Sequence, residues 1–294
     1  MSEVSLAPLT AADGDNLAVQ DWALSPVSDT EHASSRGTVL IVHGLGEHAG
    51  RYEQVASRLN AWGYNVRGYD HYGHGESGGV RGALPDDNKL LDDLADVVDN
   101  TRSRMAHEEG AAKPLILLGH SMGGLVALQF VLRGLRPVDA LVLTSPALDA
   151  GLSWFQKILL ATLPKIAPNL RVGNGLNAQF ISHDPAVVGR YRADPLVHDR
   201  ISARLANWIY TQGQDAIAHA AKLQTPTLLM YAGQDKLVNP RGSERFAQAA
   251  SPQASTAKYV QSHVFAHMYH EILNEPDADL VFERLGQWLA QRGI

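Results

Sequence analysis

The stretch LILLGHSMGGL, residues 115–125, determines the fold expected for the whole chain. An apolar run leads into Gly119-His120-Ser121-Met122-Gly123, after which apolar residues resume in a helical pattern. The spacing G-x-S-x-G is typical of a strand, a sharp turn and a helix, with the serine exposed at the edge of the sheet. Glycine is expected at the flanking positions because larger side chains would clash with neighbouring elements. The alternative is a glycine-rich helix start with an ordinary capping serine.

The rest of the chain alternates short apolar segments with helical patterns. Strands are predicted at 38–44, 64–70, 114–119, 138–146, 225–235 and 256–261, and helices at 51–63, 90–108, 123–134, 239–250 and 278–290. This alternation predicts right-handed crossovers and a mainly parallel sheet. A turn signal at residues 13–16, before the apolar segment 17–24, predicts a hairpin at the start.

The alternation stops after Pro146 and resumes only near the strand predicted at 225–235. The segment between them is rich in proline and glycine and contains isolated helical pieces. We therefore expect one α/β core of residues 1–147 and 213–294, with residues 148–212 inserted over it as a helical cap, or lid.

Composition narrows the function classes. The net charge of -6, with acids and bases interspersed, argues against nucleic-acid binding. The lack of cysteine excludes disulfides and a cysteine nucleophile, and it fits a reducing compartment. No signal-peptide pattern and no apolar run of about 18 residues occurs. We expect a cytoplasmic protein that can lie peripherally at a membrane, and the sequence predicts no oligomeric state.

A serine nucleophile needs a base, and the base needs an acid that fixes its tautomer. In this arrangement the acid follows the serine along the chain, just past a late strand. Asp235 has that position after the apolar run 226–232. Asp215 is the second candidate, but it precedes the strand.

Three histidines follow the strand predicted at 256–261, namely His263, His267 and His270. We choose His270 as the base because it lies nearest the last helix, and His267 is the second candidate. His267 and His270 could also form a metal pair at i, i+3. No H-E-x-x-H motif or cysteine set accompanies them, so neither a metal nor a cofactor is predicted.

Acyl transfer also needs N–H donors aimed at the developing oxyanion. One is expected from Met122, because the first N–H groups of a helix are free and its dipole favours negative charge. The second is expected from Leu45, in the His43–Gly46 turn that follows an early buried strand. The alternative for this turn is a plain strand ending.

Four segments together resemble the monoacylglycerol lipase and lysophospholipase group of serine α/β-hydrolases. They are HGLGEHAGRY (43–52), YDHYGHGES (69–77), GHSMGG (119–124), and YAGQDKLV with HMYHEILNE near the C-terminus. The resemblance implies the α/β-hydrolase fold, with helices on both faces of the sheet and an inserted cap. It implies a triad of Ser121, Asp235 and His270, with Leu45 and Met122 at the oxyanion.

The resemblance also implies that the polar head group of the ester is surrounded by Glu47, Arg51, His120 and Tyr191. From the residues alone, Glu47 and Arg51 could equally be a surface ion pair of little energetic value. Asp70 and His74 of the second segment are expected to hold a loop in place.

An apolar stripe in the insertion recurs at helical spacing: Trp154, Phe155, Ile158, Leu159, Thr162, Leu163 and Ile166. It predicts a cap helix lining an acyl pocket, and transient contact with a membrane surface is the weaker hypothesis. The function expected is that of a serine esterase for single-chain lipid esters. A carboxylesterase, thioesterase or acyltransferase is the alternative among enzymes, and a non-catalytic ligand-binding protein is the alternative of another class.

Overall fold

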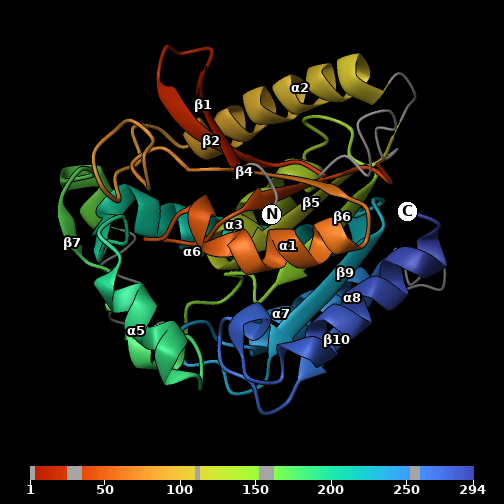
Figure 1. Ribbon diagram of the computed structural model, residues 1–294. Coiled ribbons are helices and arrows are strands. Elements are labelled where there is room, and N and C mark those ends of the chain that lie inside the picture. The colour runs from red at the N-terminus through yellow and green to blue at the C-terminus, as the bar shows by residue number, and fades with distance from the viewer. Residues whose placement is uncertain (1–3, 25–34, 110–112, 152–161, 252–258) are drawn as a thin grey trace.

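The computed structural model describes residues 4–24, 35–109, 113–151, 162–251 and 259–294, and its centre is an eight-stranded sheet (Figure 1). The strand order is β1-β2-β4-β3-β5-β6-β9-β10. β1 (Val4–Thr10) and β2 (Asn16–Trp22) form the predicted hairpin, and β2 is antiparallel to β4 (Asn65–Tyr69). The other strands run parallel: β3 (Thr38–Val42), β5 (Leu115–His120), β6 (Ala140–Thr144), β9 (Thr227–Ala232) and β10 (Val260–Phe265). The mainly parallel sheet is therefore confirmed.

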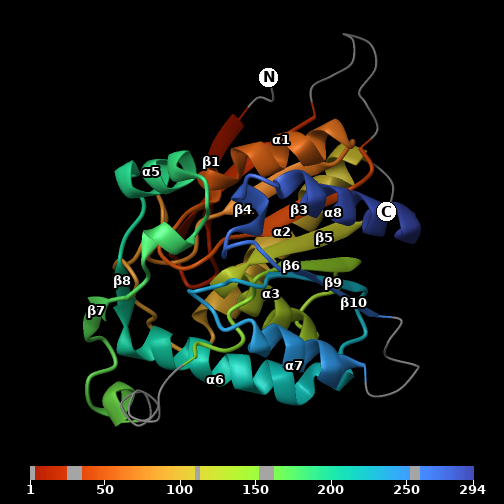
Figure 2. The same cartoon turned by 90° about the horizontal axis from the view of Figure 1, so that it is seen from below.

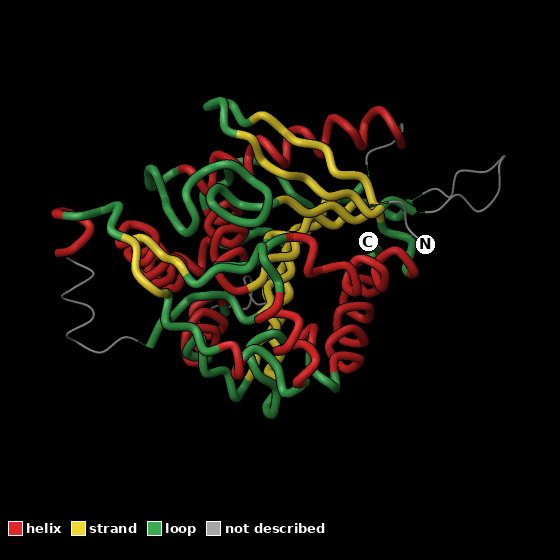
Figure 3. Tube along the Cα trace, turned by 60° about the vertical axis from the view of Figure 1, so that its left-hand side comes forward, coloured by secondary structure: helices red, strands yellow, loops and turns green. Residues whose placement is uncertain are grey.

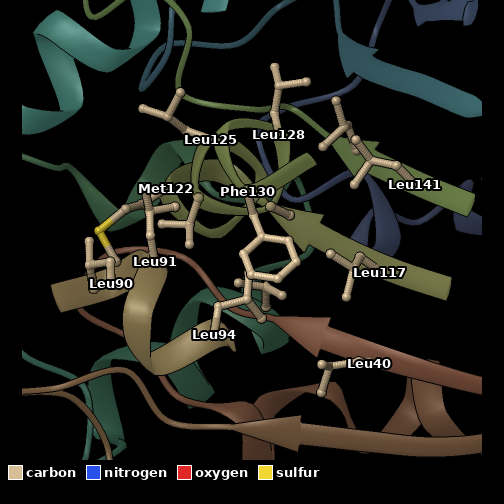
Figure 4. Packing of buried hydrophobic residues seen from close by; sticks show 14 of the residues in the cluster. Leu40, Leu90, Leu91, Leu94, Leu117, Met122, Leu125, Leu128, Phe130 and Leu141 are labelled. Atoms are coloured by element: carbon tan, nitrogen blue, oxygen red, sulfur yellow. The ribbon is translucent and has the colours of Figure 1, made fainter. Parts of the chain in front are cut away.

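Helices cover both faces of the sheet (Figure 2). One face packs against η1 (Ala49–Tyr52), α1 (Glu53–Ala61) and α8 (Ala278–Arg292), and the other against α2 (Lys89–Glu109), α3 (Ser121–Leu132), α6 (Ala203–His219) and α7 (Arg241–Ala250). Successive strand residues such as Leu40 and Ile41 enter opposite cores, which is why the central strands read as continuous apolar runs. Figure 4 shows leucines of α2, α3, β3 and β5 packed in one of these cores.

The last strand differs from its prediction. Residues 256–261 were expected, but β10 begins at Val260 and continues to Phe265, in register with Thr227–Ala232 of β9. It is an edge strand in which only Val260 and Phe265 are buried, so it lacks the apolar run that marks the central strands. As a consequence, His263 lies within the strand and not after it.

The segment expected as an insertion, residues 148–212, lies between β6 and β9 in the chain, and the structure describes its residues 148–151 and 162–212. It contains the two-stranded sheet of β7 (Arg171–Gly173) and β8 (Arg200–Ser202), which Figure 3 shows apart from the main sheet, and also η2 (Ala178–Phe180) and α5 (Pro185–Ala193). α6 continues through the boundary expected at residue 212. The positions 154–159 of the apolar stripe lie outside the described residues. Among the helices that the structure describes, none combines the length and the apolar character needed to cross a membrane.

Candidate active site

Ser121 occupies a strained turn between β5 and α3. Its φ is +52°, in the left-handed region that side chains other than glycine rarely adopt. A Cβ on Gly119 would lie 2.7 Å from the carbonyl oxygen of Gly123, and a Cβ on Gly123 would lie 2.1 Å from that of Val42. Glycine is therefore required on both sides of the serine, because its backbone passes so close to neighbouring chain segments.

The β3 loop, residues 43–48, lies against this turn. A Cβ on Gly44 would be 3.3 Å from the Cβ of Ser121, and Leu45 lines the same cavity as the serine. His43 holds the loop, because its Nδ1–H donates to the Gly44 carbonyl at 2.8 Å while its Nε2 accepts from the N–H of His71 at 3.0 Å. The β3 loop therefore adjoins the serine, and the role of the Leu45 N–H as an oxyanion donor stays a prediction.

Met122 is the first residue after the serine in α3. Its side chain is buried in the core, and Figure 4 shows it with Leu90 and Leu91 of α2. This packing fixes the first turn of α3, where backbone N–H groups have no partner within the helix. The role of the Met122 N–H as an oxyanion donor stays a prediction.

Asp235 and His270 form a buried pair. Asp235 follows β9 and His270 follows β10, so the two adjacent strands bring them together across 35 positions of sequence. Nδ1–H of His270 donates to Oδ2 of Asp235 at 2.7 Å, and Oδ1 accepts from the N–H groups of Leu237 and Val238 at 2.9 Å each. This hydrogen bond fixes the tautomer that leaves Nε2 of His270 free to accept a proton.

The pKa shifts of the pair follow from this contact. Burial would raise the pKa of Asp235, but the adjacent His270 outweighs it and holds that pKa below its ordinary value. Burial would likewise lower the pKa of His270, and the Asp235 carboxylate raises it above its ordinary value instead. The carboxylate therefore stays ionised and strengthens the imidazole as a base.

The other sequence candidates lie elsewhere. Asp215 is paired with His219 of its own helix, at 3.0 Å. His263 lies in β10, where its ring contacts Phe265, and His267 is exposed. The structure therefore brings together the acid and the histidine that the sequence favours. Among the described residues, no group of three or more histidine, aspartate or glutamate side chains could hold a metal ion.

His120, which directly precedes the serine, lies beside His270 with the ring centroids 4.8 Å apart. Its Nδ1–H donates to the Thr144 carbonyl at 3.1 Å. Burial, with a further contribution from His270, lowers the pKa of His120 to about 4, so the ring is neutral near pH 7. This contact places His270 at the strained turn that carries Ser121.

A cavity of about 440 Å³ opens at Ser121. Its walls come from three parts of the chain. These are the β3 loop with the serine turn, residues between β6 and the middle of α6, and the segment after Asp235. They include Leu45, Met122, Ala147, Leu176, Ile201, Ala206, Ile209, Leu237 and Val238. A mainly apolar cavity that ends at the serine suits an acyl chain.

Beside the serine lies a buried ionic cluster. Arg51 donates to Glu47, and it forms a two-pronged pair with Glu271 at 2.8 Å for each N–O contact. The guanidinium also lies over the ring of Tyr191, 4.7 Å from the centroid. Burial opposes ionisation of Glu47, but Arg51 together with other neighbouring groups outweighs it and lowers the pKa of Glu47 to about 2. Burial raises the pKa of Tyr191 to about 12.

Glu47, Arg51 and Tyr191 are thus together as expected, and the alternative of an exposed surface pair is wrong for Glu47 and Arg51. Glu271 also belongs to this cluster, although it is not among the residues that the sequence predicts for the site. An acid directly after the chosen histidine was the available signal, but its partner Arg51 lies 220 positions away in sequence. Such a pairing cannot be read from spacing.

The segment expected as an insertion is hydrogen-bonded to the loop that carries His270 and to the β3 loop. The N–H of Glu271 donates to the Ile181 carbonyl at 2.8 Å, next to His270. The N–H of His198 donates to the Gly46 carbonyl at 2.9 Å, in the β3 loop. The described part of this segment is therefore attached to the loop that carries His270 and to the β3 loop.

Comparison with known proteins agrees with this architecture. The family model described as serine aminopeptidase, S33, matches residues 33–277. The monoacylglycerol lipase of Mycolicibacterium smegmatis is 35% identical over 263 residues, covering 88% of this chain and 90% of that protein. Phospholipase YtpA of Bacillus subtilis is 29% identical over 249 residues, covering 83% and 92%. The crystal structure of the monoacylglycerol lipase of Paleococcus ferrophilus superposes with a TM-score of 0.75 at 30% identity, covering 98% and 99%.

With a family model that spans most of its length and a relative of 35% identity, the chain belongs to the serine aminopeptidase S33 family, as a serine α/β-hydrolase of the monoacylglycerol lipase type.

Proposed function

We propose that this lipid ester hydrolase acts on single-chain lipids, of the monoacylglycerol or lysophospholipid type, through an acyl-enzyme at Ser121. The observation that carries the proposal is the 2.7 Å bond from His270 to Asp235, beside a strained serine that opens into an apolar cavity. Relatives named monoacylglycerol lipase and phospholipase support the substrate class.

The reaction has two halves. His270 Nε2 takes the hydroxyl proton of Ser121 as the serine oxygen attacks the ester carbonyl, and Asp235 stabilises the imidazolium. The tetrahedral oxyanion lies against the N–H groups of Leu45 and Met122. The alcohol leaves with the proton from His270. Water then loses a proton to His270 and attacks the acyl carbon, which releases the fatty acid and restores the serine.

The head group is proposed to bind beside the ionic cluster. Arg51, His120 and Tyr191 offer polar groups near the serine, and Glu47 acts there mainly by orienting Arg51, because its own oxygens are already hydrogen-bonded. No cofactor takes part in the proposed reaction.

Residues 148–212 are proposed to act as the cap over a core of residues 1–147 and 213–294. In the described part of this segment, four large apolar side chains are exposed, with exposed fractions from 37% to 83%: Ile166, Leu170, Val172 and Leu176. We propose that they contact a membrane surface transiently, which would bring the active site to its substrate. Co-sedimentation with phosphatidylcholine vesicles tests this, and Ile166→Ser with Leu170→Ser should reduce the bound fraction while hydrolysis of a water-soluble ester is unchanged.

A hydrolysis panel tests the function itself. It compares monoacylglycerols, lysophospholipids, 4-nitrophenyl esters from acetyl to palmitoyl, an acyl thioester and an aminoacyl 4-nitroanilide, each with the wild type and Ser121→Ala. Medium or long acyl chains should be preferred, and the variant should be inactive. Preference for the acetyl ester, the thioester or the anilide would contradict the proposed lipid substrate class. Absence of turnover with every compound would contradict the proposal that the protein is an enzyme.

A further inference from the structure

Glu271, the residue after the proposed base, is a buried carboxylate with a complete set of partners. Its side chain is 6% exposed. Nη1 of Arg51 donates to Oε1 and Nη2 donates to Oε2, both at 2.8 Å, and Nδ2 of Asn274 donates to Oε2 at 2.8 Å. Two parallel charged hydrogen bonds of this kind fix the plane of the guanidinium. The reaction as proposed gives Glu271 no chemical task.

The same guanidinium reaches the β3 loop. Nη1 of Arg51 also donates to Oε2 of Glu47. Oε1 of Glu47 in turn accepts from the backbone N–H of Gly44 at 2.6 Å and from the hydroxyl of Tyr52 at 2.8 Å. Glu271, Arg51, Glu47 and Gly44 therefore form one continuous buried chain of hydrogen bonds, from the histidine loop to the loop that carries Leu45.

This chain of hydrogen bonds affects the position of the oxyanion donor, because Gly44 has little freedom to move. A Cβ there would lie 2.8 Å from Oε1 of Glu47 and 3.3 Å from the Cβ of Ser121, so the loop is held between the two. An oxyanion donor is effective only within a few tenths of an ångström of its position. If Glu47 moves, Gly44 moves with it, and so does the adjoining N–H of Leu45.

We propose that Glu271 is a positioning residue for the reaction: through Arg51 and Glu47 it holds the N–H of Leu45 in place against Ser121, and it joins that loop to its own neighbour His270. It does not touch the substrate. Glu47 alone cannot orient Arg51 in the same way, because it receives only Nη1, whereas Glu271 receives both terminal nitrogens. The proposal rests on the proposed function, whose oxyanion donor and base it aligns.

The charge of Glu271 has a second, separable effect. The charged and titratable groups that act on His270 include Asp235, Glu271, Glu47 and the neutral His120, and Arg51 is paired with Glu271. Glu271 raises the pKa of His270, so its neutralisation lowers that pKa and leaves the positive charge of Arg51 less balanced, which acts in the same direction. A change at Glu271 should therefore alter the pH profile, whereas loss of packing alone would not.

The test compares Glu271→Gln with the matched control Glu275→Gln. Glu275 lies on the same loop and its side chain is 3% exposed, but it accepts from the N–H groups of His183 and Tyr269 and not from Arg51. With 4-nitrophenyl butyrate, kcat of Glu271→Gln should fall about 10- to 100-fold with KM within about twofold, and the acid limb of kcat/KM should move to lower pH. Glu275→Gln should keep both the acid limb and most of kcat.

Glu271→Asp separates position from charge. The shorter side chain keeps the carboxylate but cannot reach both nitrogens of Arg51, so kcat should fall while the acid limb stays near that of the wild type. This variant also serves if Glu271→Gln does not fold. A wild-type kcat in folded Glu271→Gln, or an equal loss of kcat in Glu275→Gln, overturns the positioning role of Glu271 and leaves the proposed function intact. A wild-type enzyme without turnover overturns both.

Discussion

The imidazole rings of His120 and His270 lie 4.8 Å apart, with their planes inclined at 55°, and their pKa values shift in opposite directions. Burial lowers the pKa of His120 to about 4, whereas Asp235 outweighs burial and raises that of His270. The ring next to the serine therefore stays uncharged while its neighbour takes up a proton. A charged His120 would repel the imidazolium that forms in the transition state, and its neutrality removes that cost.

The first prediction concerns pH. The base must be neutral to accept the serine proton, so kcat/KM should rise as pH passes the pKa of His270, which lies above the ordinary value of about 6.5. Asp235→Asn removes the carboxylate that raises the pKa of His270, so the acid limb of the kcat/KM profile should move to lower pH. At the same time kcat should fall about 10³- to 10⁴-fold. Rate profiles from pH 5 to 9 measure both effects. His267→Ala is the control, and loss of activity there would point to the wrong histidine.

The second prediction concerns the strained turn. In Gly123→Ala the new methyl group would lie 2.1 Å from the carbonyl oxygen of Val42, so we expect a loss of about 1–3 kcal/mol in the free energy of unfolding, and loss of activity. Gly189→Ala is the matched control, because Gly189 is exposed within α5 with open space around its Cα, and it should gain about 0.5–1 kcal/mol. Urea denaturation compares them, and equal stabilities would contradict the steric account.

The third prediction concerns chain length. Ala206 lines the cavity from α6, so Ala206→Phe should fill part of the 440 Å³ and shorten the preferred acyl chain. Each excluded methylene should lower kcat/KM about fourfold, since its burial contributes about 0.8 kcal/mol. Acetyl and butyryl esters should react as with the wild type. Ala218→Phe, at an exposed position of the same helix, is the control. A change of preferred chain length in Ala218→Phe, or no change in Ala206→Phe, would rule out this cavity as the acyl site.

The fourth prediction concerns Lys89. Its side chain is 2% exposed, and Nζ lies 2.8 Å from Asp15, 2.9 Å from Asp93 and in contact with Asp13, so it ties the β1–β2 turn to α2. Lys89→Met leaves these carboxylates without their cation and should destabilise the protein by about 3–5 kcal/mol. Arg136→Ala breaks an exposed pair with Asp99 and should leave the melting temperature nearly unchanged. Thermal denaturation distinguishes the two variants. Similar melting temperatures would show that the buried Lys89 ion pairs contribute no more to stability than the exposed pair.

The fold could be predicted from the sequence where the signal is local. The central strands are buried on both faces, so each appears as an apolar run that ends in a turn. Asp235 and His270 could be paired in advance because the carboxyl ends of adjacent parallel strands meet at one edge. β10 was misplaced because the middle of this edge strand, Gln261-Ser262-His263, is polar and partly open to solvent, so the strand shows no continuous apolar run.

The remaining features depend on contacts distant in sequence. Nothing near Glu271 indicates that Arg51 will receive both its oxygens, and nothing near Ile201 indicates that it will face Ser121 across a cavity. The first contact depends on how η1 packs against the loop after β10, and the second on how the segment of residues 148–212 packs against the core. The glycines of the strained turn are different, because their requirement arises from the turn itself.

The hydrogen bonds that the insertion makes with both catalytic loops have a consequence for protein engineering. Ile181 holds the backbone beside His270, and His198 holds the backbone at Gly46. A chimera that exchanges this segment for that of another hydrolase would replace the substrate walls and, at the same time, the supports of the catalytic loops. Transplants that retain residues 180–183 and 198–202 should therefore keep turnover more often than exchanges of the whole segment.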